Sequence, residues 1–140
     1  MRPALPTDPA RSALMRRVRR ARTAPEERLA LALRAIGIHY RRNVRGLPGS
    51  PDFANKRRRW AIFVMGCFWH QHRGCKRATV PKRNHAFWVA KFAQNRRRDA
   101  AKIRRLRALG FRVYLLWECR EPAEWIEAQT RSGGDTFSAR

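Results

Sequence analysis

The sequence predicts an α/β domain, because two short apolar runs flank a long segment of helical periodicity. The runs, WAIFVM at 60–65 and FRVYLL at 111–116, are rich in aromatic and β-branched residues and are typical of buried strands. The segment from about Asn84 to Leu109 repeats apolar residues at steps of three and four, and Gly110 ends it. A strand–helix–strand unit places its two strands parallel in one sheet, so their carboxyl ends meet at one edge.

A second helix is predicted before this unit. Thr23 and Glu26 have the spacing of a capping box, and Leu29 and Leu33 continue at helical spacing until Gly37 ends the helix. After it, IHYRRNV at 38–44 alternates weakly as a strand. The turn-rich stretch GLPGSPDF then delivers Asp52 onto a short extended segment.

The length of 140 residues suits one compact domain. Residues 1–10 contain three prolines and little periodicity, so we expect a flexible lead-in there. We expect a single domain over 11–130 and a flexible tail at 131–140.

The charge of the chain indicates a polyanionic partner. Thirty-three Lys and Arg residues face ten Asp and Glu residues, which gives a net charge of +23. Much of this excess is arginine, which binds phosphates in bidentate fashion, so nucleic acid is favoured over a membrane surface. The longest uncharged run, Trp60 to Gln71, is much shorter than the ~20 apolar residues of a membrane-spanning helix. No signal-peptide pattern follows the basic N-terminus, and we expect a cytoplasmic protein that does not bind membranes.

The three cysteines predict a metal site. Cys67 follows the first apolar run by two residues and Cys119 follows the second by three, so the parallel topology brings them to one edge. With His72 and Cys75 they make a Cys₃His set, which is a tetrahedral ligand set for structural zinc. An odd number of cysteines in a cytosolic chain argues against disulfides. The alternative is that they are buried free cysteines.

His70 and Asp99 are candidates for chemistry. His70 lies two residues before His72, outside the expected metal set, and its imidazole is either free for proton transfer or an ordinary surface histidine. Asp99 falls on the apolar face of the long helix, where a carboxylate needs a partner. That partner is either His70, whose imidazole it would orient, or an arginine in a structural pair. The face comprises Trp88, Phe92, Asn95, Asp99, Ile103 and Leu106.

Six arginines occupy other faces of the same helix. They form either a solvated surface or a strip that faces phosphates, and the basicity of the helix favours the second interpretation. They are Arg96, Arg97, Arg98, Arg104, Arg105 and Arg107.

Six motifs occur in this order along the chain: TAPEERL (23–29), LPGSPDF (47–53), GCFWHQH (66–72), VPKRNHAFW (80–88), NRRRD (95–99) and GFRVYLLWEC (110–119). Through these motifs the chain resembles the very short patch repair (Vsr) mismatch endonucleases, from about Arg11 to Cys119.

The resemblance implies a restriction-endonuclease-like α/β fold, with a central mixed sheet flanked by helices and a structural zinc. It implies Mg²⁺-dependent nicking of double-stranded DNA 5′ of the T in a T:G mismatch, which arises when 5-methylcytosine deaminates. In this chain, Asp52 and the backbone carbonyl of Val64 would bind Mg²⁺. His70 would be the catalytic histidine, Asp99 its partner and Glu26 a helix acid near the site.

The resemblance also assigns DNA contacts and partners. Aromatic side chains would wedge into the base stack beside the mismatch, where stacking is weak, and an N-terminal helix would insert from the opposite groove. Without the resemblance, Phe68, Trp69 and Trp88 could all be core residues, and the core is the favoured interpretation for Trp88, which lies on the apolar face of the long helix. A MutL-type repair protein is an implied partner, and we expect a monomer in the bacterial cytoplasm at the nucleoid. The DNA-contacting residues would be Phe68, Trp69, Trp88, Met15, Val18 and Lys91.

Two departures from the family pattern bear on activity. Met65 stands where the family usually has a histidine, and Val64 stands where it has a threonine. The run 60–65 also lacks the second acid and the lysine of generic nucleases of this fold. Catalysis would then rest on Asp52, His70, Asp99 and bound water. Two alternatives follow: a zinc-stapled DNA-binding protein with weak or no cleavage, and a restriction-type nuclease with another target.

Overall fold

A four-stranded mixed sheet is the centre of the computed structural model, which describes residues 23–132. The strands follow one another across the sheet in chain order, β1-β2-β3-β4. The expected lead-in at 1–10, the N-terminal contacts of Met15 and Val18, and almost all of the expected tail lie outside the described residues. The described elements are α2 (Ala24–Ala35), β1 (Arg41–Arg42), β2 (Phe53–Asn55), β3 (Trp60–Met65), α3 (His85–Ala108), β4 (Arg112–Trp117) and α4 (Pro122–Arg131).

The predicted strand–helix–strand unit is confirmed. β3 and β4 are parallel, in a register that runs from Trp60 opposite Arg112 to Met65 opposite Trp117. β2 pairs antiparallel with both β1 and β3. The prediction of a strand over 38–44 was too long, since β1 contains only two residues. The carboxyl ends of β3 and β4 therefore meet at one edge, where the chemistry-bearing residues were expected.

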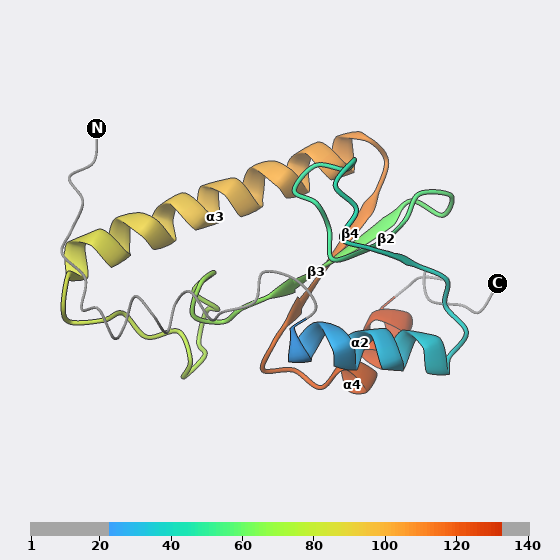
Figure 1. The fold of residues 1–140 in the computed structure, drawn as a ribbon, viewed down its shortest axis with the longest axis horizontal. Helices are drawn as coiled ribbons and strands as arrows, with labels where there is room; N and C mark the ends of the chain where they lie inside the picture. The colour runs from blue at the N-terminus through green and yellow to red at the C-terminus, as the bar shows by residue number, and fades with distance from the viewer. Residues whose placement is uncertain (1–22, 133–140) are drawn as a thin grey trace.

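Alternating side chains of β3 build two separate cores. Trp60 and Ile62 pack on one face with Leu29 of α2 and Trp125 of α4. Residues on the other face, including Phe63, form the second core. Figure 1 shows this arrangement, with α3 on one side of the strands and the α2–α4 pair on the other. The sheet is thus covered on both faces, as expected for an α/β domain.

The ends of α2 follow the sequence signals. The Glu26 side chain accepts a hydrogen bond from the Thr23 backbone N–H at 3.3 Å, which closes the predicted capping box. Gly37 follows the helix at φ +75°, a left-handed conformation that glycine adopts without steric cost. Glu26 is 4% exposed. The cap therefore also fixes a buried carboxylate at the first turn of α2.

Helix α4 was not predicted. Its first residue is Pro122, which suits the first turn because a proline lacks the N–H that would be unsatisfied there. Trp125 and Ile126 are buried against α2, and the indole N–H of Trp125 donates to the Leu115 carbonyl. The expected tail boundary at 131 coincides with the last residue of this helix.

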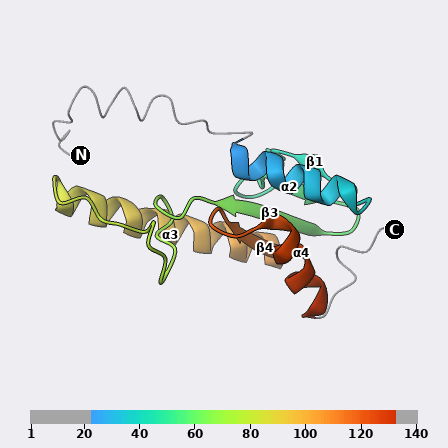
Figure 2. The same cartoon turned by 90° about the horizontal axis from the view of Figure 1, so that it is seen from below.

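The first half of α3 extends past the sheet. The loop after β3 lies beside this half in both views of the ribbon (Figure 1 and Figure 2). The Asn95 amide donates to the Trp69 carbonyl at 2.9 Å and ties the loop to the helix. Among the described helices, none is long and apolar enough to cross a membrane.

Candidate active site and metal centre

Asp52 and Val64 meet where β2 begins and β3 nears its end. The Oδ2 atom of Asp52 accepts a hydrogen bond of 2.7 Å from the Val64 N–H. The N–H and C=O of one residue point to the same side of an extended strand, as paired antiparallel residues show. The Val64 carbonyl is therefore directed to the side of β3 on which Asp52 lies. The Asp52 carboxylate and the Val64 carbonyl, the two Mg²⁺ ligands that the resemblance implies, are therefore neighbours.

A cavity of about 370 Å³ lies beside these groups. It brings together Asp52, the α2 acid Glu26 and His70, residues that are far apart in the sequence. Three further lining residues are of chemical interest: Met65, Lys102 and Glu118. The remaining lining residues are Thr23, Pro25, Gly49, Ser50, Phe63, Val64, Gly66 and Trp69.

The environment of Asp52 disfavours its charge. Burial raises the pKa of Asp52 from 3.8 to about 7, and the neighbouring Glu26 carboxyl adds to the rise. The hydrogen bond from Val64 and the charge of Lys102 lower the pKa, but they do not outweigh burial. Two acids that line one cavity favour a bound cation, which would keep the Asp52 carboxylate ionised.

His70 and Asp99 form the expected pair. The Nδ1 atom of His70 lies 2.7 Å from Asp99 Oδ2, and the Lys102 ammonium lies 3.0 Å from Asp99 Oδ1. The alternative prediction was that Asp99 pairs with an arginine. In the structure Asp99 instead contacts Lys102 as well as His70. Burial alone would raise the pKa of Asp99, but the hydrogen bond from His70 and the charges of His70 and Lys102 bring it below its usual value. An ionised Asp99 can accept a hydrogen bond from the Nδ1–H group of His70, a tautomer that leaves Nε2 free to accept a proton.

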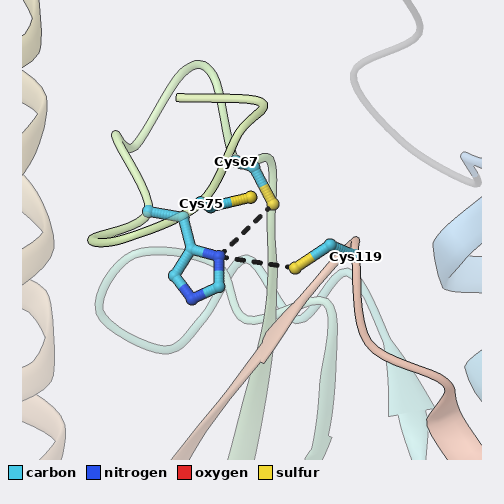
Figure 3. Close-up of side chains that lie close together, drawn as sticks. Cys67, Cys75 and Cys119 are labelled. Atoms are coloured by element: carbon cyan, nitrogen blue, oxygen red, sulfur yellow. Dashed lines mark hydrogen bonds between the residues drawn. The ribbon is translucent and has the colours of Figure 1, made fainter. Parts of the chain in front are cut away.

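Cys67, His72, Cys75 and Cys119 lie together at the carboxyl edge of β3 and β4. One ligand atom from each falls within 4.8 Å of all the others, so the predicted cluster is confirmed as a group that could hold a metal ion (Figure 3). The Nδ1 atom of His72 is 3.6 Å from the sulfur of Cys67 and 3.4 Å from that of Cys119. Tetrahedral zinc would place a sulfur and a nitrogen ligand roughly 3.5 Å apart. The donor set and its spacing therefore fit zinc.

The surroundings of this cluster orient its ligands. The His72 ring stacks on Trp117 with 4.2 Å between centroids and 9° between planes. The backbone N–H of Cys67 donates to the Glu118 carboxylate at 3.2 Å. Burial raises the pKa of the Cys67 thiol to about 12, and the nearby thiols add to the rise. A coordinated metal ion reverses this effect, because it binds the thiolate.

The aromatic residues expected to contact DNA form one cluster with two neighbours. Phe68 lies against Trp69, Trp88 and Phe92 with centroid distances of 5.2, 5.5 and 5.2 Å. Trp88 is only 9% exposed, whereas Phe68 and Trp69 are half-buried. In this structure Trp88 is thus a packing residue of α3, and the wedge role of all three stays a prediction. Lys91 lies half-buried on α3.

Met65 is buried at 2% exposure, with Ala54, Phe63 and Leu106 in the core beneath α3. Because it also lines the cavity, the departure from the family histidine lies within the site.

Two residues of the site were missed by sequence reasoning. Lys102 lies three residues after Asp99 on α3, at a spacing that puts the two side chains on one face. Glu118 precedes the ligand Cys119 directly. Both spacings were visible in the sequence, but charged neighbours of this kind are common on surfaces.

The assembled groups define a class of protein. A histidine that contacts an aspartate, beside the carboxyl groups of Glu26 and Asp52 in a chain of net charge +23, has the parts of an enzyme that hydrolyses nucleic acid.

Comparisons with known proteins identify the family. The family model described as DNA mismatch endonuclease Vsr matches residues 5–77. The type II nicking enzyme V.XorIIP of Xanthomonas oryzae pv. oryzae is 42% identical over 106 residues, which are 76% of this chain and 77% of that protein. DNA mismatch endonuclease Vsr of Escherichia coli is 43% identical over 109 residues, covering 78% of this chain and 69% of that protein. The type II nicking enzyme V.NmeAIP of Neisseria meningitidis is 34% identical over 109 residues, covering 78% and 77%. The chain belongs to the Vsr family of DNA mismatch endonucleases.

Proposed function

We propose that this protein nicks double-stranded DNA on the 5′ side of the T in a T:G mismatch and so initiates very short patch repair. The observation that carries the proposal is the His70–Asp99 pair, whose histidine lines the same cavity as Asp52 and Val64. Membership of a mismatch endonuclease family supports the reaction class.

Asp52 and the Val64 carbonyl are the proposed ligands of a catalytic Mg²⁺. Oxygen donors from carboxylates and backbone carbonyls are those that Mg²⁺ prefers, so these residues fit the ion. When bound, Mg²⁺ would supply charge stabilisation at the phosphoryl group and a lower pKa for a bound water. Glu26, buried next to Asp52, would help to hold the cation through its negative charge.

His70 is the proposed proton acceptor. Its Nδ1 faces Asp99, so Nε2 of the neutral ring is left to accept a proton from the attacking water. Asp99 keeps this tautomer and orientation, and it stabilises the imidazolium after proton transfer.

Zinc is the proposed occupant of the Cys₃His cluster. Cys67, His72 and Cys75 would hold the loop, and Cys119 would tie it to the end of β4. His70 lies in the chain between two of these ligands, so zinc would also fix the backbone that carries the proton acceptor.

Mismatch recognition is proposed to rest on Phe68 and Trp69, with Trp88 behind them. The two half-buried rings can unstack a weak base step at lower cost than a matched one. We also propose that the protein acts as a monomer, and that a MutL-type protein is its repair partner.

Two duplexes that differ only in G:C versus T:G test the function. With Mg²⁺, we expect a single nick 5′ of the mismatched T and none in the matched duplex. Asp52→Ala should abolish the nick while binding persists, and Glu124→Ala, an exposed acid of α4, is the matched control. Binding without cleavage by the unaltered protein would support the DNA-binding alternative, and cutting of the matched duplex would support a restriction-type nuclease.

A further inference from the structure

We propose that Lys102 is a positioning residue of the catalytic site, which holds Asp99 for His70 and supplies a positive charge to the cavity beside Asp52. This inference rests on the proposed function, because it assigns Lys102 a part in the same reaction.

Lys102 completes the restraint of the Asp99 carboxylate. Its Nζ atom is 3.0 Å from Oδ1, while His70 Nδ1 is 2.7 Å from Oδ2. Each oxygen of the carboxylate therefore has its own charged or polar partner. Without Lys102 the carboxylate could rotate about its last torsion, and the imidazole would lose its fixed acceptor.

The position of the ammonium group is itself restricted. The Lys102 side chain is 19% exposed, and Nζ lies 4.2 Å from the centroid of the Phe63 ring. Its stem packs on Gly49, where an added Cβ would come within 2.6 Å of the Lys102 Cδ atom. The backbone of Gly49 thus makes room for this lysine, and the packed stem restricts where the ammonium group can lie.

The charge balance of the cavity shows why such a cation is useful. Three carboxyl groups line the cavity, those of Glu26, Asp52 and Glu118. Among the described residues that line it, Lys102 is the single lysine or arginine. A phosphodiester entering this cavity would meet mainly negative charge, and a fixed ammonium reduces that repulsion without reorganisation. The electrostatic effect of Lys102 already reaches Asp52, whose pKa it lowers.

The cation of this cavity comes from α3 and not from β3. The run 60–65 carries no lysine or arginine. Lys102 reaches the cavity from α3, with its ammonium group over the Phe63 ring.

Lys102→Met, Lys102→Arg and a matched control test the inference. Methionine keeps the apolar stem on Gly49 but removes the charge, whereas arginine keeps the charge. We expect Lys102→Met to lower kcat for nicking by about tenfold to a hundredfold with a much smaller change in KM. Lys102→Arg should recover most of the loss. Lys56→Met, an exposed lysine between β2 and β3, should leave kcat unchanged.

A second measurement does not depend on activity. The hydrogen-bonded Nδ1 proton of His70, assigned by its loss in His70→Gln, should give a downfield NMR signal that weakens or shifts in Lys102→Met and returns in Lys102→Arg. An unchanged signal together with unchanged kcat, even at lower Tm, would overturn the proposal and leave Lys102 a structural ion pair. If the unaltered protein did not nick mismatched DNA, the proposed function would fail, and the His70 signal would still decide the role of Lys102.

Discussion

The Nδ1 atom of His70 lies 2.7 Å from the Oδ2 atom of Asp99, although 29 positions separate the two residues. The loop after β3 carries the histidine and the middle of α3 carries the aspartate, so the pair forms only when loop and helix dock. Asn95, one helical turn before Asp99, holds the loop through the Trp69 carbonyl.

The first prediction concerns this pair. Asp99→Asn should lower kcat by roughly a hundredfold to ten-thousandfold, because the amide cannot stabilise the imidazolium and can favour the wrong tautomer. Single-turnover nicking of a T:G duplex measures the effect. Glu127→Gln, an exposed acid of α4, is the control. An Asp99→Asn protein that nicked at the original rate would remove His70 from the role of proton acceptor.

The sequence was sufficient for those parts of the fold that local patterns encode. The boundaries of β3 agree with its apolar run, and Thr23 and Gly37 mark the limits of α2 as expected. The parallel pairing of β3 and β4 follows from the general handedness and connection rules, and it correctly brought Cys67 and Cys119 together.

Other parts depend on contacts that no local pattern contains. Helix α4 is stabilised by burial of Trp125 and Ile126 against α2, and its ten residues would be marginal as an isolated helix. Of the strand predicted over 38–44, only Arg41 and Arg42 pair with β2, so β1 is limited to these two residues. The place of Lys102 in the site could not be predicted, because its side chain is positioned by contacts with Gly49 and Phe63, which belong to other segments.

The second prediction concerns pH and the stability of the Mg²⁺-free protein. The pKa of Asp52 is about 7 in the fold and 3.8 ordinarily, so the folded state binds this proton more tightly than the unfolded chain. The stability that the protonated group contributes is therefore lost as the pH rises through about 7. Asp52→Asn avoids this loss, since its side-chain oxygen can still accept from Val64 while carrying no charge.

Urea unfolding at several pH values measures the difference. The free energy of unfolding of Asp52→Asn should exceed that of the unaltered protein at pH ~8, and the two should converge near pH ~4. Added Mg²⁺ at the higher pH should stabilise the unaltered protein more than the variant. If the variant were less stable at the higher pH, the hydrogen bond from Val64 would outweigh the burial of the charge.

The third prediction concerns the Cys₃His cluster. Elemental analysis should find one zinc per chain, and removal by a chelator should lower Tm by at least about 5 °C, since metal binding contributes directly to folding. His72→Ala should lose the metal, whereas His39→Ala, at an exposed histidine outside the cluster, should retain it. A melt that is unchanged by the chelator would contradict the four-ligand assignment.

The fourth prediction distinguishes the arginines of α3 that contact DNA phosphates from those that do not. Arg98 and Arg105 line a second cavity of about 500 Å³, together with His70, Asp99 and Lys102. They are the members of the basic strip that face the catalytic pair, so we expect them to contact phosphates of the nicked strand. Arg98→Gln and Arg105→Gln should each weaken DNA binding and reduce the slope of log K against log salt by about 1.

Arg97→Gln is the matched control for these variants, because Arg97 is exposed and does not line this cavity. It should change the slope less than either Arg98→Gln or Arg105→Gln. Equal slopes for all three variants would show that the helix offers a diffuse basic surface rather than a phosphate path beside His70.

The fifth prediction concerns Met65, which is 2% exposed and yet lines the cavity of Asp52. Met65→His restores the residue that the family usually has at this position. We expect the variant to fold and to nick at least as fast as the unaltered protein, because an imidazole at the cavity margin adds a group able to carry protons. Its Tm should fall by a few degrees, since a polar ring replaces methionine against Phe63 and Leu106.

Met65→Leu is the control. It keeps the apolar volume and should leave the rate unchanged, so a gain in both variants would point to packing rather than proton transfer. A slower Met65→His protein with an intact fold would show that methionine is adapted to this cavity, in which Lys102 already places a positive charge.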